Sequence, residues 1–463
     1  MALTETVPTA PPPVHEGILR RQALRESAAR TYARSLPIVP VRARGLTIEG
    51  ADGRRYLDCL SGVGTLALGH NHPVVLEAIR TALDSGAPLH ALDLATPVKD
   101  AFTTELFATL PGELAEKARI QFCGPAGTDA VEAAACLVRT ATGRDGLLAF
   151  SGARHGTTIG APAAPGGSRR TAVTRLPHPD AHRCPPGTGE RGAGLATRWT
   201  EHLIDDPESG IPHPAGLIVE PVQGEGGVIP APDSWLRRMR ATTAARGIPL
   251  IVDEARTGVG RTGTFWAVEH SGIVPDVLVL SKAIGGSLPL AVIVHREELD
   301  CRRPGAHHDV FRGNQLAMAA GSATLAYVRE NGLARRAADL GARMLAQLGT
   351  LAAAHPCIGD VRGRGLMIGV ELIDPEAAPD ATGARPAAPD LAAAVQRTCL
   401  DRGLIVEPGG RHGAVIRLLP PLTITDEQAD AILDRLADAI AAAVRMTPGP
   451  TGSSPTTMRG TSR

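Results

Sequence analysis

The 463-residue sequence has few aromatic residues and no excess of either charge. Only 3% of its residues are Phe, Trp or Tyr, although 43% are hydrophobic, so the core must be built mainly from Ala, Val, Leu and Ile. Lys plus Arg and Asp plus Glu both number 48, which gives a formal net charge of zero. Because a neutral chain lacks a strong basic field, we expect neither nucleic acid nor a membrane surface as a partner.

Long hydrophobic runs are also missing. No apolar stretch approaches the ~20 residues that span a bilayer, and residues 1–6 lack the basic and apolar regions of a secretory signal peptide. The seven cysteines are scattered, odd in number and without a CxxC pair, which favours free thiols in a reducing cytoplasm. The tight cluster His307-His308-Asp309 fits a surface loop at least as well as a metal site, so we expect no bound metal.

The length of the chain predicts more than one domain. Segments rich in Pro, Ala, Gly, Ser and Thr predict disordered tails over residues 1–15 and 447–463. Between the tails we expect an N-terminal segment, residues 16–64, that packs with a small C-terminal domain, residues 331–446. The remaining residues, 65–330, form the expected large domain.

Apolar runs alternate with helical stretches along the large domain. The expected strands are residues 147–150, 216–219, 250–252, 277–280 and 291–294. The expected helices are residues 128–142 and 233–246. Continuous apolar strands suit a mainly parallel sheet with helices on both faces, so the predicted fold class is α/β.

The C-terminal part has a different pattern. Its expected elements are a helix over residues 333–354, a glycine-punctuated strand region over 359–372, a further helix, strands over 403–406 and 415–419, and a last helix over 425–444. This order predicts a smaller α+β domain. A hairpin is expected around Asp52 and Gly53, and residues 161–194 and 374–389 resemble long loops.

Lys282 is the strongest candidate for a catalytic residue. It follows an apolar strand, and burial of a lysine lowers its pKa and makes its amine a nucleophile toward carbonyls. Asp253 ends a second apolar strand 282 − 253 = 29 residues earlier, which is enough chain to connect neighbouring parallel strands. A lysine that forms a Schiff base and an aspartate that holds a pyridinium nitrogen are the two protein groups that pyridoxal 5′-phosphate (PLP) chemistry needs.

Three further segments carry polar residues where strands and helices meet. Residues 124–132 form a glycine-rich turn before a helix, and the backbone N–H groups of such a turn suit a phosphate. Residues 151–156 follow one strand and residues 220–227, with two carboxylates, end another. Because open α/β sheets bind ligands beyond the carboxyl ends of their strands, the three segments together indicate a binding site.

Taken together, these residues resemble the class III aminotransferases, which are PLP-dependent enzymes of fold type I, and among them the diaminobutyrate–2-oxoglutarate aminotransferase group. The resemblance covers about residues 30–446. Its characteristic stretches are residues 64–73, 127–132, 274–286 and 311–319.

The resemblance implies roles for matching residues. Lys282 would bind PLP covalently and move a proton, Asp253 would keep the ring nitrogen protonated, and Gly127 and Thr128 would hold the phosphate. Ala126 and His155 would also contact the cofactor.

On the substrate side, the resemblance implies that Arg417 binds the α-carboxylate of glutamate or 2-oxoglutarate. Glu225 would neutralise Arg417 when a distal amino group enters instead. Relatives in the family are homodimers with sites at the subunit interface, which the resemblance implies here too.

Four positions that would line the cofactor depart from the family pattern. Arg154 replaces an aromatic residue that stacks on the ring, and its guanidinium could stack instead. Ala255 and Arg256 replace a valine under the ring and a glutamine that reaches the phenolic oxygen. Val310 replaces a threonine that reaches the phosphate of the neighbouring subunit.

Two alternatives to transamination stay open on the sequence. The four departures could mark a different PLP reaction, such as decarboxylation, racemisation or elimination, or a PLP-binding protein with little catalysis. Lys282 and Asp253 argue against the second alternative, whereas Glu225 and Arg417 favour transamination over the first. We therefore expect amino transfer between glutamate or 2-oxoglutarate and a small amino acid, with 2,4-diaminobutyrate and aspartate semialdehyde as the favoured pair.

Overall fold

The computed structural model describes most of the chain. The described residues are 14–27, 36–156, 173–180, 182–183, 189–301, 305, 310–381 and 383–446. The expected C-terminal tail, residues 1–13 of the expected N-terminal tail and the cluster at 307–309 lie outside them. Helix α1 (Val14–Arg25) begins inside the stretch that the sequence assigns to the N-terminal tail.

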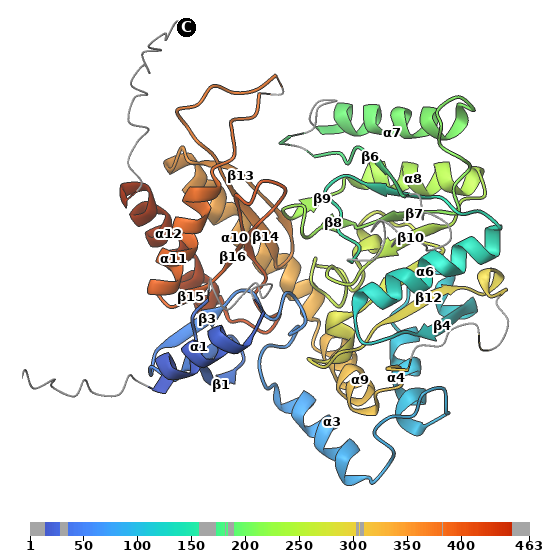
Figure 1. Cartoon of the computed structure of the whole chain (residues 1–463), viewed down its shortest axis with the longest axis horizontal. Helices are drawn as coiled ribbons and strands as arrows, with labels where there is room; N and C mark the ends of the chain where they lie inside the picture. The colour runs from blue at the N-terminus through green and yellow to red at the C-terminus, as the bar shows by residue number, and fades with distance from the viewer. Residues whose placement is uncertain are drawn as a thin grey trace, which may run out of the picture.

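A seven-stranded sheet forms the centre of the part drawn on the right of Figure 1, in the order β4-β12-β11-β10-β7-β5-β6. Its strands are β4 (Ala118–Phe122), β5 (Leu147–Phe150), β6 (Val173–Leu176), β7 (Gly216–Val219), β10 (Leu250–Asp253), β11 (Val277–Leu280) and β12 (Val292–Arg296). Strands β11, β10, β7, β5 and β6 pair in parallel, whereas β12 pairs antiparallel with both β11 and β4. The expected α/β class is confirmed.

Both faces of this sheet are buried. Leu250 and Val252 of β10 belong to one hydrophobic cluster, whereas Ile251 between them belongs to another, together with the alanine-rich helix α6 (Gly127–Thr142). Helix α8 (Asp233–Ala245) packs against β10 and against α7 (Gly189–Asp205). The strands are continuous apolar runs because each successive side chain faces a different covered core.

Three helices pack together below the sheet in Figure 1 and were not predicted from the sequence. They are α3 (Pro73–Asp84), α4 (Pro97–Phe107) and α9 (Gln315–Glu330). Their start signals are nevertheless local. The Thr96 side chain accepts a hydrogen bond from the Lys99 N–H at the start of α4, and the Asn314 side chain accepts one from the Ala317 N–H at the start of α9.

The C-terminal part is α+β, as expected. Its antiparallel sheet has the order β13-β14-β17-β16 and consists of β13 (Ile358–Arg364), β14 (Met367–Leu372), β16 (Glu407–Gly409) and β17 (Val415–Leu418). The helices of this part are α10 (Leu333–Ala354), α11 (Pro389–Asp401) and α12 (Asp426–Met446). Helix α10 has the bounds that the sequence predicts.

The N-terminal hairpin joins this C-terminal part. Strands β1 (Pro40–Arg44), β2 (Thr47–Gly50) and β3 (Arg55–Asp58) are antiparallel neighbours, and the β2–β3 turn contains Asp52 and Gly53 as expected. Strand β3 pairs in parallel with β15 (Leu404–Ile405). This pairing supports our domain division, whose boundaries stay a proposal.

One predicted long loop is wrong in part. Residues 161–194 include strand β6 and the first turns of α7. Strand β6 is a short edge strand that carries Arg175, so its alternation is weak, and α7 begins with three glycines that mask its helical pattern. Burial of Ala193, Ala196 and Thr197 stabilises α7 there. In contrast, residues 374–388 carry one isolated bridge, between Ile373 and Ala387, before α11 begins.

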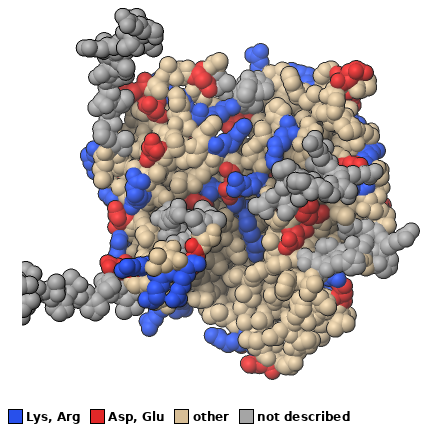
Figure 2. Space-filling model, in the orientation of Figure 1, with Lys and Arg blue, Asp and Glu red and all other residues tan. Residues whose placement is uncertain are grey.

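The remaining elements are short. They are α5 (Leu114–Lys117), β8 (Val222–Gln223), β9 (Ile229–Pro230) and the 3-10 turns η1 (Ala267–His270), η2 (Lys282–Gly285) and η3 (Glu297–Leu299). Among the helices of the described residues, none is both long enough and apolar enough to cross a bilayer. On the face shown in Figure 2, acidic and basic side chains are interspersed, and basic ones gather over α1 and β1 at the lower left.

Candidate active site

Three neighbouring parallel strands end in ionisable residues at the same edge of the sheet. Glu220 follows β7, Asp253 ends β10, and Lys282 lies two residues after β11. The register aligns Asp253 with Val279 of β11, so the two strands end side by side. The sequence prediction that Asp253 and Lys282 come from neighbouring parallel strands is confirmed.

Asp253 is buried and hydrogen bonded to His155. The Asp253 Oδ2 and His155 Nδ1 atoms are 2.9 Å apart, and the Ala255 N–H donates to Asp253 Oδ1 at 3.1 Å. Burial by itself would raise the pKa of Asp253, but the hydrogen bond and charge of His155 outweigh it and lower the pKa. Burial opposes protonation of His155, yet the Asp253 carboxylate raises the pKa of His155 overall. Asp253 is therefore a negative group held in one orientation.

Lys282 has a strained backbone and an unusually acidic ammonium group. Its φ is +55°, in the left-handed region that lysine rarely adopts, at a cost on the order of 1–2 kcal/mol. Burial of the ammonium, together with the nearby charge of Arg256, lowers the pKa of Lys282 to about 7. The amine is thus substantially neutral near pH 7, which is the form that attacks a carbonyl carbon.

Glu220 is a third buried group that the sequence analysis placed at a strand end but did not assign a role. Its Oε1 accepts a hydrogen bond from the Arg154 N–H at 3.0 Å, and its Oε2 accepts one from the Gly224 N–H at 2.7 Å. Burial raises the pKa of Glu220, although the positive charge of His155 opposes the rise. Glu220 therefore fixes two loops at the edge of the site.

The amino end of α6 lies next to these groups. A Cβ atom on Gly127 would lie 3.4 Å from the Ser281 Cβ and 3.9 Å from the Ala255 Cβ, so the helix start faces the ends of β10 and β11. Gly156, with φ +87°, lies so close to Thr128 that a side chain there would overlap it. The first N–H groups of a helix have no partner within it. The N–H of Ala126 is used by Asp129 at 2.9 Å, which leaves Gly127 and Thr128 as the candidate anion donors.

Two of the expected cofactor residues are less closely tied to this cluster. The Arg154 side chain is exposed, and the contact of this residue with the site is through its backbone N–H. Val310 is 59% exposed, beside Phe311 at 71%. Within one chain, neither side chain is buried against Asp253 or Lys282.

A second group of charges, the substrate-side cluster, consists of Glu225, Arg256, Glu407 and Arg417. The Glu225 Oε1 atom lies 2.5 Å from Arg256 Nη2 and 3.0 Å from Arg417 Nη1. Arg417 Nη2 also lies 2.5 Å from Glu407 Oε2. Burial would raise the pKa of Glu225, but the two guanidiniums lower it to about 2. The structure thus brings the expected pair Glu225 and Arg417 together.

Sequence reasoning missed Glu407. It lies on β16 directly opposite Arg417 on β17. Opposite charges at facing positions of antiparallel strands attract each other, but the facing position depends on the register, which the sequence alone did not reveal. The four members of the cluster come from four separate segments.

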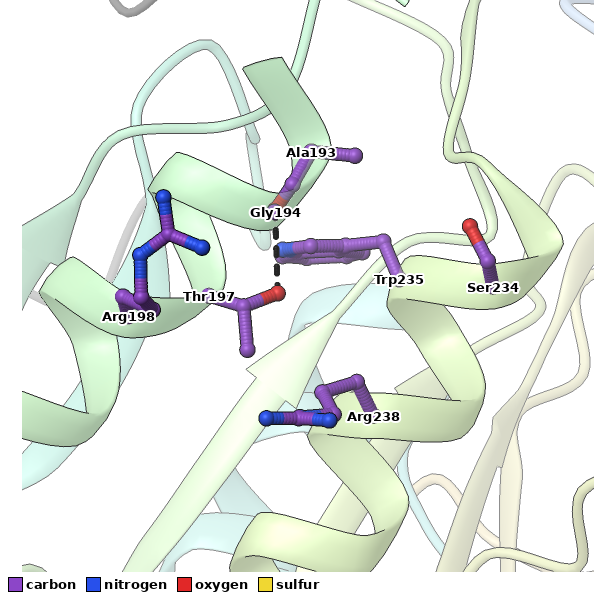
Figure 3. A pocket seen from close by; sticks show the side chains of 7 residues that line it. All are labelled: Ala193, Gly194, Thr197, Arg198, Ser234, Trp235 and Arg238. Atoms are coloured by element: carbon purple, nitrogen blue, oxygen red, sulfur yellow. Dashed lines mark hydrogen bonds between the residues drawn. The ribbon is translucent and has the colours of Figure 1, made fainter. Parts of the chain in front are cut away.

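A separate pocket of about 260 Å³ lies between α7 and α8 (Figure 3). Its lining residues are Ala193, Gly194, Thr197, Arg198, Ser234, Trp235 and Arg238. The Thr197 hydroxyl donates to the Ala193 carbonyl at 2.9 Å. This lining has no carboxylate, lysine, histidine or cysteine, so the edge of the sheet remains the better candidate for chemistry. Within the described residues, no group of three or more His, Cys, Asp or Glu side chains is arranged to hold a metal.

Two curated relatives that share one name are similar to this protein over nearly the whole chain. A diaminobutyrate–2-oxoglutarate aminotransferase of Rhizobium meliloti (strain 1021) is 53% identical over 91% of this chain and 92% of its own length. A protein of the same name from Haemophilus influenzae is 45% identical over 93% of this chain and 96% of its own length.

Solved structures agree in fold. An amine transaminase from an uncultivated Pseudomonas species, solved in its PLP-bound form, has a TM-score of 0.79 and 30% identity, covering 90% of this chain and 98% of its own. An (S)-enantioselective omega-transaminase of Thermomicrobium roseum has a TM-score of 0.81 and 27% identity, covering 93% and 98%. The model of the family described as aminotransferase class-III matches residues 28–440. The chain belongs to the class-III aminotransferases.

Proposed function

We propose that this aminotransferase moves an amino group between L-glutamate or 2-oxoglutarate and the terminal amine or aldehyde of a small amino acid. L-2,4-diaminobutyrate and L-aspartate 4-semialdehyde are the proposed amine and aldehyde. The observation that carries the proposal is Lys282, a partly buried amine with a pKa of about 7 beside the Asp253 strand end. The names of the two curated relatives support the choice of substrates.

The residues of the site fit PLP as the cofactor. A neutral amine, a buried carboxylate of low pKa and a helix start next to both are the groups that would hold its aldehyde, ring nitrogen and phosphate. Lys282, Asp253, Gly127 and Thr128 would hold it in these roles. Bound PLP supplies an electron sink that stabilises negative charge on the substrate carbon.

The side chains of the site would bind and orient the cofactor and transfer the proton. Lys282 Nζ would hold the cofactor and, once released from it, would take the proton of the substrate carbon and return it, for which a pKa near 7 is well matched. His155 keeps Asp253 ionised and oriented through the 2.9 Å hydrogen bond. Ala255 lies beside Gly127 at the same edge, where it would contact the ring.

The substrate-side cluster would select the substrate. Arg417 is the proposed receptor for a carboxylate, and Glu225 compensates it when a substrate with an amino group enters. The 3.0 Å contact between Glu225 and Arg417 supports this exchange. Arg256 shares the same Glu225 oxygen, which the family pattern does not include.

We also propose a homodimer in the cytoplasm. Large exposed apolar side chains gather in residues 89–94 and 310–311, and the two segments meet where the His90 and Phe311 rings lie with their centroids 6.5 Å apart. A partner subunit would cover these side chains, and Val310 of each subunit would then lie near the site of the other. The six cysteines among the described residues form no disulfide, which supports a reducing compartment.

The test uses the purified, PLP-loaded protein with L-2,4-diaminobutyrate and 2-oxoglutarate. We expect L-glutamate to form in the wild type and not in Lys282→Ala. Borohydride reduction followed by intact mass measurement should attach the cofactor to the wild type alone. Carbon dioxide release or racemisation without glutamate formation would contradict transamination, and attachment of the cofactor in Lys282→Ala would contradict the role of Lys282.

A further inference from the structure

The two arginines of the substrate-side cluster are not equivalent. Both contact the Glu225 Oε1 atom, but Arg417 also pairs with Glu407 at 2.5 Å. The Glu407 pair is built into the sheet, because the two residues face each other across β16 and β17. Within the described parts of the chain, Glu225 is the one acidic partner of Arg256. If the Glu225 carboxylate moves away, Arg417 keeps a negative neighbour and Arg256 does not.

Arg256 is enclosed rather than free to follow Glu225. A Cβ atom on Gly224 would lie 2.7 Å from Arg256 Cδ, and one on Gly64 would lie 3.6 Å from Arg256 Cγ, so the stem is packed on both sides by glycines. The side chain is 11% exposed, and its Nη1 atom is buried without a hydrogen-bond partner. A guanidinium held in this way needs a negative group to compensate it.

The Glu225 side chain can move away from Arg256 because it is partly exposed and lies between two glycines. Glu225 lies between Gly224 and Gly226, and its side chain is 29% exposed. The loop backbone itself is fixed, because Gly224 accepts a hydrogen bond from Arg417 Nη1 at 3.4 Å and Gly227 accepts one from Arg362 Nε at 2.9 Å. The movable part is therefore the Glu225 side chain.

Arg256 is also the member of the cluster whose charge acts strongly on Lys282, since it is the largest cause after burial of the lowered Lys282 pKa. A ligand group bound by Arg256 would therefore lie within electrostatic range of the reacting amine. A small dicarboxylic acid can place one carboxylate on Arg256 while the rest of the molecule lies near the Lys282 amine, because its two carboxylates are joined by a short chain.

We propose that Arg256 is a specificity-determining residue, which binds one carboxylate of the dicarboxylic partner when the Glu225 carboxylate moves off it. When the other substrate presents an amino group, Glu225 returns and covers Arg256. The proposal rests on the proposed function, since it concerns the acceptor of the same reaction. It assigns the selection of a dicarboxylate over a monocarboxylate to Arg256, and not to Arg417 by itself.

The experiment compares wild type, Arg256→Gln and Arg256→Lys, each loaded with PLP. Equilibrium binding is measured with glutarate and with pentanoate, which have the same chain length but two carboxylates and one. In parallel, KM and kcat are measured with 2-oxoglutarate and with 2-oxopentanoate. Circular dichroism and the thermal midpoint check that each variant folds.

We expect Arg256→Gln to weaken glutarate binding and to raise the KM for 2-oxoglutarate by roughly tenfold to a hundredfold, the size expected for one lost hydrogen bond to a charged group. Pentanoate binding should change little, kcat should change less than KM, and Arg256→Lys should recover part of the loss. Equal losses for both ligands, or none, would overturn the proposal.

The two failures can be told apart. A wild type that transfers no amino group contradicts the proposed function, while the glutarate and pentanoate measurements still test Arg256 by binding alone. A wild type that is active, with an Arg256→Gln variant that keeps the preference for the dicarboxylate, contradicts the role of Arg256 alone.

Discussion

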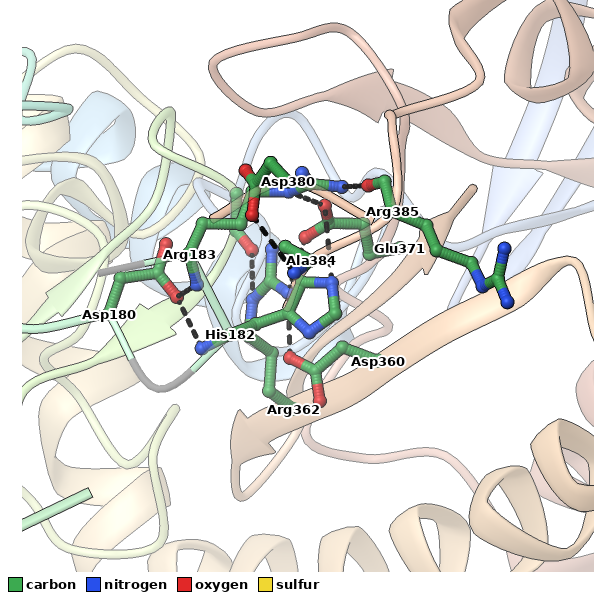
Figure 4. A network of polar contacts seen from close by, with 10 residues as sticks. Asp180, His182, Arg183, Asp360, Arg362, Glu371, Asp380, Ala384 and Arg385 are labelled. Carbon is green, nitrogen blue, oxygen red and sulfur yellow. Dashed lines mark hydrogen bonds and ion pairs between the residues drawn. The ribbon is translucent and has the colours of Figure 1, made fainter. Parts of the chain in front are cut away.

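Two glutamates of this chain are each held between two arginines, in very different surroundings. Glu225 lies in a glycine-rich loop, contacts Arg256 and Arg417, and has a side chain that is 29% exposed. Glu371 lies one residue before the end of β14, contacts Arg183 and Arg362, and has a side chain that is 5% exposed. Figure 4 shows Arg183 and Arg362, which come from two segments, beside Glu371, and Asp360 beside Arg362. The same set of charges thus occurs once in the partly exposed substrate-side cluster and once in a buried network of Glu371, Arg183, Arg362 and Asp360, which we call the closed joint.

The closed joint supports the substrate-side cluster. Arg362 uses one nitrogen, Nη1, to contact Glu371 at 2.7 Å and Asp360 at 2.8 Å, and another, Nε, to donate to the Gly227 carbonyl at 2.9 Å. Arg183 contacts Glu371 and also donates to the Arg385 carbonyl at 2.8 Å. The loop that carries Glu225 is therefore anchored by the network around Glu371. The comparison teaches that a carboxylate between two guanidiniums can be held in place or free to move. The burial of its side chain and the backbone that carries it, a strand for Glu371 and a glycine-rich loop for Glu225, decide between the two.

The largest expected effect is on stability at the closed joint. Glu371→Ala leaves two mostly buried guanidiniums without their shared carboxylate, which should lower the free energy of unfolding by about 3–5 kcal/mol. Urea denaturation followed by circular dichroism measures this. Glu371→Gln keeps the shape and should cost less. A loss below about 1 kcal/mol for Glu371→Ala would show that the joint is not structural.

The next effect distinguishes the substrate-side cluster from the closed joint. Glu225→Gln should lower the free energy of unfolding by only about 1–2 kcal/mol, since Arg417 keeps Glu407 and water reaches the site. It should instead reduce kcat/KM for L-2,4-diaminobutyrate by about tenfold or more, because Arg256 and Arg417 lose the carboxylate that compensates them when an amino group enters. The half-reaction with L-glutamate is the matched control and should be retained. Equal losses with both amino donors would contradict the selective role of Glu225.

The smallest effect concerns the pH dependence of Lys282. Its pKa of about 7 lies below the ordinary value of 10.5, so the neutral amine forms as the pH rises through 7. The rate of reductive attachment of an aldehyde at Lys282, followed by mass spectrometry, should rise with a midpoint near pH 7. Between pH 7 and 10.5 the unfolded chain binds more protons at this residue, so its contribution to stability increases with pH.

Variants in the substrate-side cluster and in the closed joint should have different effects on the pH midpoint at Lys282. Arg256→Gln removes a positive neighbour and should raise the midpoint, whereas Glu225→Gln removes a negative one and should lower it. Glu371→Gln lies in the closed joint and should leave the midpoint unchanged. A shift with Glu371→Gln similar to that with Arg256→Gln would show that the two regions are electrostatically coupled, against the comparison.

Much of the large domain followed from local sequence patterns. The apolar runs predicted β5, β7, β10 and β11 to within a residue, because side chains buried on both faces of a sheet must all be apolar. Helices α3, α4 and α9 and strand β6 were not predicted. Their boundaries depend on packing against one another and on edge pairing with β5, which leave weaker marks in the sequence.

The sequence by itself determined which residues end the central strands, and so placed Asp253 and Lys282 together. Only the tertiary structure decided their partners. His155 reaches Asp253 across 98 positions, and Arg256 and Glu407 join Glu225 and Arg417 from separate loops and strands. Burial is encoded locally, because each apolar residue carries its own preference for the core. The pairing of charges depends on strand order, register and loop path, which no single segment of the sequence contains.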